Sequence, residues 1–155
     1  MATRTRNPRT GHAGTDWLAS CAPDPTSIHR AWAREDLAPL AGGDRWRVVE
    51  ADLMPSVAAM QRIGPGRLGP VMVYPEADLA WWLVPPGAAE ELADLPRLTV
   101  RPAGWALRCP PAHRYFDGRA WLEKPDGSGR LTDPVAMGAA FGPTAGPRLP
   151  AEAFG

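Results

Sequence analysis

The chain has 155 residues, enough for one domain of ordinary size with a single hydrophobic core. Its 17 lysine and arginine residues balance 17 aspartate and glutamate residues, so no overall positive field can hold a nucleic acid and any such site must be a local patch. No stretch approaches the length of a membrane span and no signal peptide is visible, so we expect a cytoplasmic protein without a membrane partner. Cys21 and Cys109 lie too far apart in sequence for a paired zinc knuckle and are expected to be reduced.

The beginning of the chain divides into a tail and an arm. The first 14 residues are polar, basic and rich in Gly, Thr and Pro, a composition typical of a disordered tail. Residues 15–43 are expected to form a helical arm. The main helix of this arm should begin at Asp24, because aspartate is a good N-cap and Pro25 suits the first helical turn.

Residues 45–101 predict an alternation of strands and helices that defines the fold class. Short apolar runs bounded by turn residues are typical of strands, and apolar residues at every third or fourth position are typical of helices. The order is strand, helix, strand, strand, helix, strand, over residues 45–51, 55–63, 69–74, 79–84, 87–95 and 98–101. It is the ferredoxin-like β-α-β-β-α-β order, which RNA-recognition modules and polymerase-type palms share. Such sheets usually bury one face under the helices and leave the other face open.

Further elements are expected after this core. Residues 105–109 and 120–123 should extend the sheet, and Thr132-Asp133-Pro134 should cap a final short helix that runs to Phe141. Residues 144–155 should form an irregular tail. The predicted fold is therefore a single α+β domain over residues 15–143, with a ferredoxin-like core and additional C-terminal strands and helix.

Three stretches, in this order and spacing, carry a resemblance to a known family. The first is a Trp-x-Val-Val strand at 46–49, followed by a helix and a strand that opens with Gly-Pro-Val at 69–71. The second is the hairpin YPEADLAWWLVPPG at 74–87. The third is LTVRPAGWALRCPPAH…GRAW at 98–121. Over residues 48–141 the chain resembles the bifunctional DNA primase/polymerase N-terminal (prim-pol) domain of the archaeo-eukaryotic primase superfamily, in a shortened form common in actinobacteria.

The resemblance implies a metal-dependent site that this chain lacks in part. Active members are expected to hold two divalent ions, Mg or Mn, with an acidic pair on one strand and a later acid, and to grip the nucleotide phosphates with a histidine. Glu50 and Asp52 stand at the acidic pair and should point to one sheet face. Residues 79–81 occupy the region where the histidine is expected, but none of them is a histidine. Thr99, a poor magnesium ligand, occupies the position of the later acid. The resemblance therefore implies a degenerate, non-catalytic domain that retains at most nucleotide or nucleic-acid binding.

Four residues near the end of the third stretch are candidates for phosphate binding. They are Arg108, His113, Arg114 and Arg119. Guanidinium groups bind phosphate with paired hydrogen bonds, so this cluster could contact a nucleic-acid backbone. The alternative for His113 is a turn histidine with a structural hydrogen bond.

Trp81 and Trp82 are the candidates for stacking or for a protein interface. Because they are adjacent in a predicted strand, their rings should face opposite sides of the sheet. One is expected in the core. The other could stack on a base, or it could anchor a protein partner or a second copy of the chain.

Two other functions are alternatives to a degenerate nucleic-acid-binding domain. One is a protein-interaction module that keeps only the scaffold. The other is an active nucleotidyltransferase that uses Glu50 and Asp52 with a displaced third ligand. These two carboxylates could instead be a solvent-facing strand end and a helix N-cap.

Overall fold

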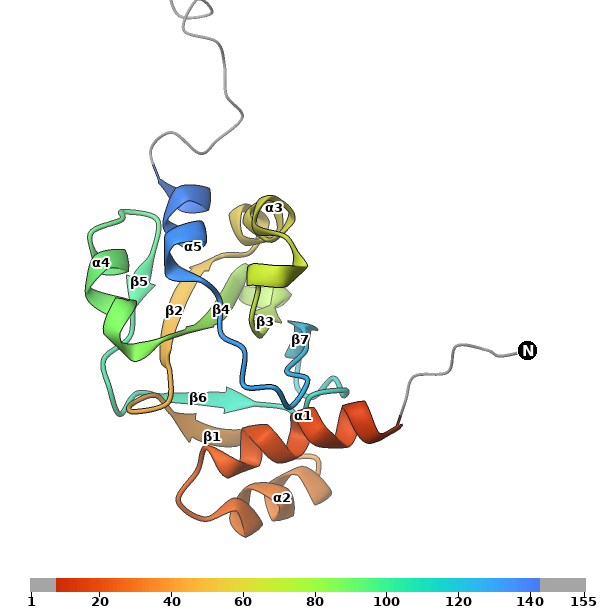
Figure 1. The fold of residues 1–155 in the computed structure, drawn as a ribbon. Coiled ribbons are helices and arrows are strands. Elements are labelled where there is room, and N and C mark those ends of the chain that lie inside the picture. Colours follow the sequence, from red (N-terminus) through yellow and green to blue (C-terminus); the bar gives the residue numbers. More distant parts are fainter. Residues whose placement is uncertain (1–7, 143–155) are drawn as a thin grey trace, which may run out of the picture.

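The computed structural model describes residues 8–142, which form five α-helices and two antiparallel sheets (Figure 1). The expected α+β class is confirmed. The helices are α1 (Pro8–Ser20), α2 (Pro25–Ala33), α3 (Leu53–Ile63), α4 (Ala89–Ala93) and α5 (Pro134–Phe141). The strands are β1 (Ala38–Ala41), β2 (Arg47–Asp52), β3 (Val71–Tyr74), β4 (Leu79–Val84), β5 (Thr99–Val100), β6 (Ala106–Cys109) and β7 (Ala120–Glu123). Among these residues no helix is long and apolar enough to cross a membrane.

The larger sheet has the strand order β5-β2-β4-β3-β7, and each neighbouring pair is antiparallel. β7 extends the sheet beside β3, as predicted. β6 does not join this sheet, contrary to the prediction, but pairs with β1 in a separate two-stranded sheet. β1 comes from the region expected to be a helical arm, so that arm is only partly helical. Its alternation explains the difference, because Ala38 and Leu40 are buried whereas Pro39 and Ala41 are exposed.

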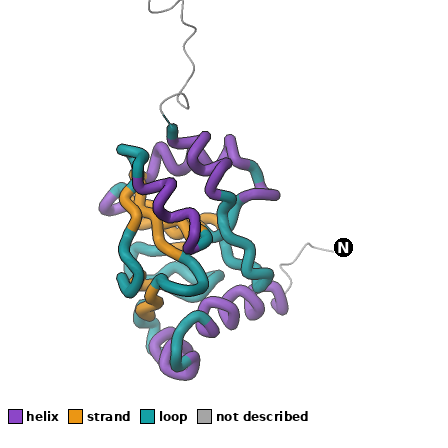
Figure 2. Tube along the Cα trace, turned by 60° about the vertical axis from the view of Figure 1, so that its left-hand side comes forward, coloured by secondary structure: helices purple, strands orange, loops and turns teal. Residues whose placement is uncertain are grey.

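Both faces of the five-stranded sheet are covered (Figures 1 and 2). On one face α3, α4 and α5 pack over the sheet, around a core that contains Trp82, Leu92 and Met137. On the other face α1, α2 and the β1–β6 sheet form a second core that contains Trp81 and Trp32. The expectation of one open sheet face is therefore wrong.

Helix α1 begins at Pro8, within the stretch expected to be a disordered tail. Its close packing against the rest of the chain gives the physical reason. A Cβ atom at Gly14 would collide with the carbonyl oxygen of Pro125, and the Thr15 hydroxyl accepts a hydrogen bond of 3.2 Å from the Ala112 N–H. Leu18 is completely buried. The rest of the expected N-terminal tail, residues 1–7, and the expected C-terminal tail, 144–155, lie outside the described residues.

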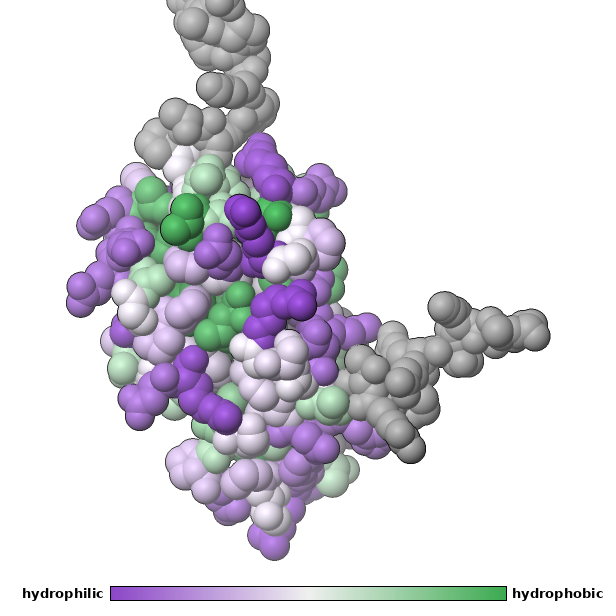
Figure 3. All heavy atoms as spheres, viewed as in Figure 1, coloured by the Kyte–Doolittle hydropathy of each residue, from purple (hydrophilic) through white to green (hydrophobic). Residues whose placement is uncertain are grey.

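The surface carries no broad apolar area in the view of Figure 3, where hydrophobic residues form small areas separated by hydrophilic ones. The large apolar side chains with high exposure in the described part of the chain are Met54, Tyr115, Leu122 and Val135. Scattered exposed apolar residues of this kind are normal for a folded domain.

Candidate functional site

Glu50 lies on β2, with β4 on one side and β5 on the other. Its register partners are Trp81 on β4 and Thr99 on β5. One carboxylate oxygen, Oε1, accepts hydrogen bonds from the Trp81 indole Nε1 at 3.0 Å and from Nη2 of Arg101 at 2.9 Å. The Glu50 side chain is only 17% exposed, so its negative charge is sheltered and is neutralised by the Arg101 guanidinium.

Arg101 is itself held in place from several directions. Its guanidinium lies over the Trp105 ring, 5.0 Å from the ring centroid. Its backbone carbonyl accepts hydrogen bonds from Nε and Nη2 of Arg47, at 3.2 and 2.9 Å. Its Nε is buried and has no hydrogen-bond partner. Arg101 is therefore a fixed cation beside Glu50.

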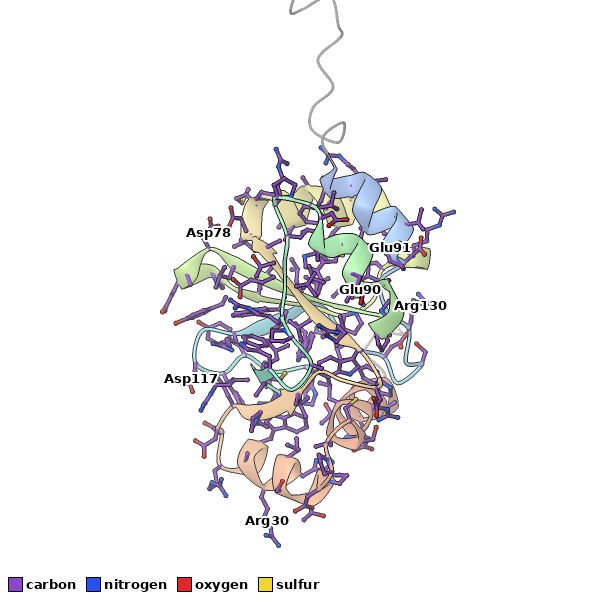
Figure 4. All side chains as sticks on the ribbon, turned by 90° about the vertical axis from the view of Figure 1, so that its left-hand side faces the viewer. Arg30, Asp78, Glu90, Glu91, Asp117 and Arg130 are labelled. Atoms are coloured by element: carbon purple, nitrogen blue, oxygen red, sulfur yellow. The ribbon has the colours of Figure 1, made fainter. Side chains whose placement is uncertain are left out.

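Asp52 lies two residues after Glu50 and on the same side of β2, but it is exposed. Its register partner is Leu79. It occupies the N-cap position of α3 without a side-chain capping hydrogen bond. The next N–H along the chain, of Leu53, donates to the Asp78 carbonyl at 3.0 Å, so Asp52 lies beside the turn that Asp78 marks at the edge of the molecule in Figure 4.

These residues do not fit a two-metal centre. Glu50 is already paired with a guanidinium, and the facing positions hold Thr99 and Leu79, which supply no carboxylate or imidazole. Within residues 8–142 no group of three or more His, Cys, Asp or Glu side chains could hold a metal ion. A cation at Glu50 would have to displace Arg101.

Arg119 supports the fold from a partly buried position. Its Nη1 donates to the Arg108 carbonyl on β6 at 2.9 Å. Its guanidinium lies over the rings of Trp81 and Tyr74, at 4.7 and 5.0 Å from their centroids. Burial lowers the pKa of Arg119. Arg119 thus links the β1–β6 sheet to the five-stranded sheet, which leaves it poorly placed for a phosphate.

His113, Arg114 and Tyr115 are three consecutive exposed residues, and we call them the 113–115 segment. Arg114 forms an exposed ion pair with Glu35, with 3.2 Å between Nη2 and Oε2. The Arg114 guanidinium also lies over the Phe116 ring, 4.8 Å from its centroid. The His113 Nδ1 lies 3.4 Å from the Thr15 hydroxyl on α1.

Arg108 is exposed on β6 and lies close to the turn at residues 34–36. It shares a surface hollow with two residues of that turn and with the Asp117 turn, labelled in Figure 4. Those two residues are Arg34 and Asp36. Arg114 pairs with the third residue of the turn, Glu35. The structure therefore brings Arg108, His113 and Arg114 to the surface and directs Arg119 inward.

Trp81 and Trp82 belong to the two opposite cores, and both are buried, with exposures of 3% and 0%. The Trp82 Nε1 donates to the Ser56 hydroxyl at 3.0 Å, and its ring meets Phe141 edge-on. Neither indole has a free face for a base or a protein partner. The expected accessible tryptophan is absent because the layer that contains α1 and α2 covers the face on which Trp81 lies.

Two residues of this region were not among the sequence candidates. Arg101 follows Thr99 by two positions, just after β5, and its N–H still donates to the Val48 carbonyl of β2 at 2.8 Å. The two-residue spacing could have paired Arg101 with Glu50 once the strand order was known. Tyr115 is 67% exposed. No local signal separates it from the adjacent aromatic residue Phe116, which is 5% exposed.

The chain matches no protein-family model, no curated protein and no solved structure. Two regions are candidates for a functional site. One is the sheltered Glu50 carboxylate on the sheet, which Arg101 neutralises, and the other is the group of exposed basic residues around the 34–36 turn.

Proposed function

We propose that the chain is a non-catalytic relative of the primase/polymerase domains, built on a ferredoxin-like core, and that it binds nucleic acid through the exposed residues Arg108, His113 and Arg114. The strand order supports the core assignment. If β2, β3, β4 and β5 are numbered 1 to 4 in chain order, their order across the sheet is 4-1-3-2. The connecting helices α3 and α4 both contribute to the core on one face. A split β-α-β arrangement has this organisation.

The observation that carries the non-catalytic assignment is the pairing of Glu50 with Arg101. In an active relative the acidic pair, the later acid and the histidine would have to surround the metal ions. The corresponding residues here are neighbours in the sheet, since Glu50 faces Thr99 and Asp52 faces Leu79. We infer that a site of the expected layout has lost two of its ligands and that a guanidinium now supplies the positive charge beside Glu50.

The binding assignment depends on the local charge around the 34–36 turn. Arg108 and Arg114 are exposed guanidinium groups, the side chain best suited to bidentate contacts with phosphate. Glu35 partly neutralises Arg114, and the whole chain has no net charge. The electrostatic contribution to binding is therefore small, so we expect modest affinity that falls with salt concentration.

Thermal unfolding tests both parts of the proposal in one set of samples. Manganese with deoxynucleotides should leave the midpoint unchanged. A stabilising shift would show a working nucleotide site, and primer extension in the same sample would then overturn the non-catalytic assignment. An oligonucleotide at about a hundred times its dissociation constant should stabilise the fold by about 2.7 kcal/mol at low salt. The absence of an oligonucleotide-induced shift at low salt would overturn the binding assignment. An Arg108→Gln, Arg114→Gln variant is the matched control, because both side chains are exposed and the variant should lose the shift without loss of fold.

Protein interaction is a second candidate function. Its surface is not the one expected from the sequence, because Trp81 and Trp82 are buried. Two hollows share Ala22, Pro23 and Pro39, so together they form one groove in which small and apolar residues alternate with charged ones, among them Arg45 and Arg108. Self-association through this groove would give a mass that rises with concentration in sedimentation experiments. Ala41→Arg, at an exposed groove position, should then restore a monomer.

A further inference from the structure

We infer that this chain forms a weak two-fold dimer in which α5 of one copy packs along α5 of the other. The dimer goes beyond the nucleic-acid binding proposed above and uses a different face of the molecule. Helix α5 has eight residues, PVAMGAAF, and none of them has a polar or charged side chain. Each of the other described helices has polar or charged side chains, so α5 is the exception among them.

The side of α5 that points away from the core is apolar too. Met137, Ala140 and Phe141 are buried in the core that α5 shares with the sheet. On the outer side Val135 is 72% exposed, and Ala139, about one turn later, is also exposed. A surface helix normally places polar residues on its solvent side, so the outer side of α5 has the character of a helix face that packs against a partner.

Basic residues lie along one flank of α5. Arg62 and Arg67 are exposed, and both line a hollow beside this helix. Nη1 of Arg62 donates to the Ala140 carbonyl at 3.2 Å, which places this arginine at the C-terminal end of α5. Arg67 also lines a second hollow with Pro134 and Val135, which places it toward the N-terminal end. The basic flank therefore extends along the length of the helix.

Acidic residues lie beside the opposite flank, because α5 lies between α3 and α4 (Figure 1). A Cβ atom at Gly138 would lie 3.9 Å from Cδ2 of Leu92 on α4, whereas Ala136 lines the hollow on the basic side. Positions 136 and 138 are about 200° apart around a helix, so α4 contacts the flank that faces away from the arginines. Glu90 and Glu91, labelled in Figure 4, are exposed on α4.

These four flanking charges select a second copy of the chain as the partner. The ion pairs formed within residues 8–142 involve other side chains, so Arg62, Arg67, Glu90 and Glu91 have no oppositely charged partner there. If two copies meet face to face about a two-fold axis parallel to α5, the basic flank of each copy lies against the acidic flank of the other. A two-fold axis across the helices would place base against base. The two α5 helices are therefore parallel, and charges beside an apolar seam fix helix orientation in coiled coils in the same way.

The interface is small. It consists of one short helix and its two flanks from each copy, which is less than a standard protein interface. Small side chains at Ala136 and Ala139 allow the two helices to approach closely, with Val135 of each copy packed near the axis. We expect a dissociation constant of about 10–500 μM.

Sedimentation velocity of the full chain at low salt, from about 1 μM to about 1 mM, tests the dimer. The mass of the wild-type chain should rise from one copy toward two. Val135→Asp should weaken association by about tenfold or more, because it places two like charges opposite each other near the axis. An aspartate in the first turn suits the helix dipole, so the thermal midpoint should not fall. Ala41→Arg, in the groove described above, is the matched control and should associate like the wild-type chain.

Charge reversal tests the parallel arrangement. One variant combines Arg62→Glu with Arg67→Glu, and the other combines Glu90→Arg with Glu91→Arg. Each variant alone should associate about fivefold to tenfold more weakly than the wild-type chain, because like charges meet on both flanks. An equimolar mixture of the two variants should form a mixed dimer, because every flank then meets one of opposite charge. Loss of fold in either variant would prevent this recovery, so the recovery reports the contact between copies.

Three results would overturn the inference. The first is a wild-type chain that keeps the mass of one copy up to about 1 mM, which would make residues 143–155, the segment after α5, the alternative occupant of this face. The second is association that Ala41→Arg abolishes and Val135→Asp preserves, which would assign the contact to the groove. The third is a mixture of the two charge variants that fails to recover. None of these results bears on nucleic-acid binding, which the oligonucleotide-induced shift tests separately.

Discussion

Arg101 directly follows β5 and pairs with Glu50 on the adjacent strand β2, and 2.9 Å separates the guanidinium Nη2 from the carboxylate Oε1. The two side chains are 33% and 17% exposed, so water screens the pair incompletely. The same Oε1 atom also accepts the Trp81 indole N–H. This arrangement converts a sheltered acid of the sheet from a potential metal ligand into a structural group. The first two predictions follow from it.

Arg101→Met should destabilise the fold by about 1–3 kcal/mol, because it leaves the sheltered Glu50 carboxylate without its cation. Urea unfolding at neutral pH measures the loss. Glu50→Gln combined with Arg101→Met should recover part of it, since the neutral amide needs no counter-charge and still accepts the Trp81 N–H. A loss below about 0.5 kcal/mol in Arg101→Met would show that the pair is screened like an ordinary surface ion pair.

Thr99→Asp combined with Arg101→Ala should give the chain a manganese-dependent rise in its thermal midpoint. The two changes add a carboxylate directly opposite Glu50 and remove the competing guanidinium, so three acids with Asp52 share one sheet face. The wild-type chain and Thr99→Asp alone, which keeps Arg101, are the controls and should show no shift. A double variant that ignores manganese would contradict the inferred origin of this face as a metal site.

Gly69→Ala should destabilise the fold by about 1–3 kcal/mol. A Cβ atom there would lie 2.5 Å from the backbone carbon of Leu131 and the backbone nitrogen of Thr132. The Gly69 N–H also donates to the Thr132 hydroxyl at 2.9 Å, so the two segments cannot separate without losing a buried hydrogen bond. Gly66→Ala is the matched control, because a Cβ atom at Gly66 meets nothing within 4 Å. Equal midpoints in denaturant for the two variants would refute the close approach.

Glu123→Gln should stabilise the chain at neutral pH and flatten the pH dependence of its stability in the acid range. Burial raises the pKa of Glu123, and the nearby Asp126 adds to this while Arg130 opposes it. A carboxyl with a raised pKa in the folded state favours folding when it is protonated, so its contribution is present below the unfolded-state pKa and is lost as pH rises through the folded-state pKa. The free energy of unfolding, measured from pH 3 to pH 8 for the wild-type chain and for the variant, gives the pH dependence of each. If the wild-type and variant curves run parallel, Glu123 does not contribute.

Elements defined by local pattern were predicted well from the sequence. β4 has the bounds predicted for it, and α5 begins after Asp133, whose carboxylate accepts the Ala136 N–H at 3.1 Å. β2 and α3 each differ from the predicted bounds by a few residues. Periodicity and capping depend on residues that are close in sequence, so they can be recognised without knowledge of the fold.

Features that depend on contacts distant in sequence were missed. The partnership of β1 with β6 was hidden, because a four-residue strand with Pro39 at an exposed position has almost no local signal. The burial of Trp81 depends on α1 and α2, which lie far from it in sequence. The packing of Arg119, one of the four phosphate candidates, was hidden for the same reason, since the rings that it lies over belong to Tyr74 and Trp81.

The position of β1 has a consequence for how the chain reaches this structure. The Trp32 indole donates a 2.8 Å hydrogen bond to the Cys109 carbonyl, across 77 residues of sequence. During synthesis the first two helices and β1 therefore leave the ribosome long before the strand that completes their layer. Until β6 is available, β1 has no partner strand and the core that contains Trp81 and Met72 is incomplete, so we expect closure of this long loop to be a slow stage of folding.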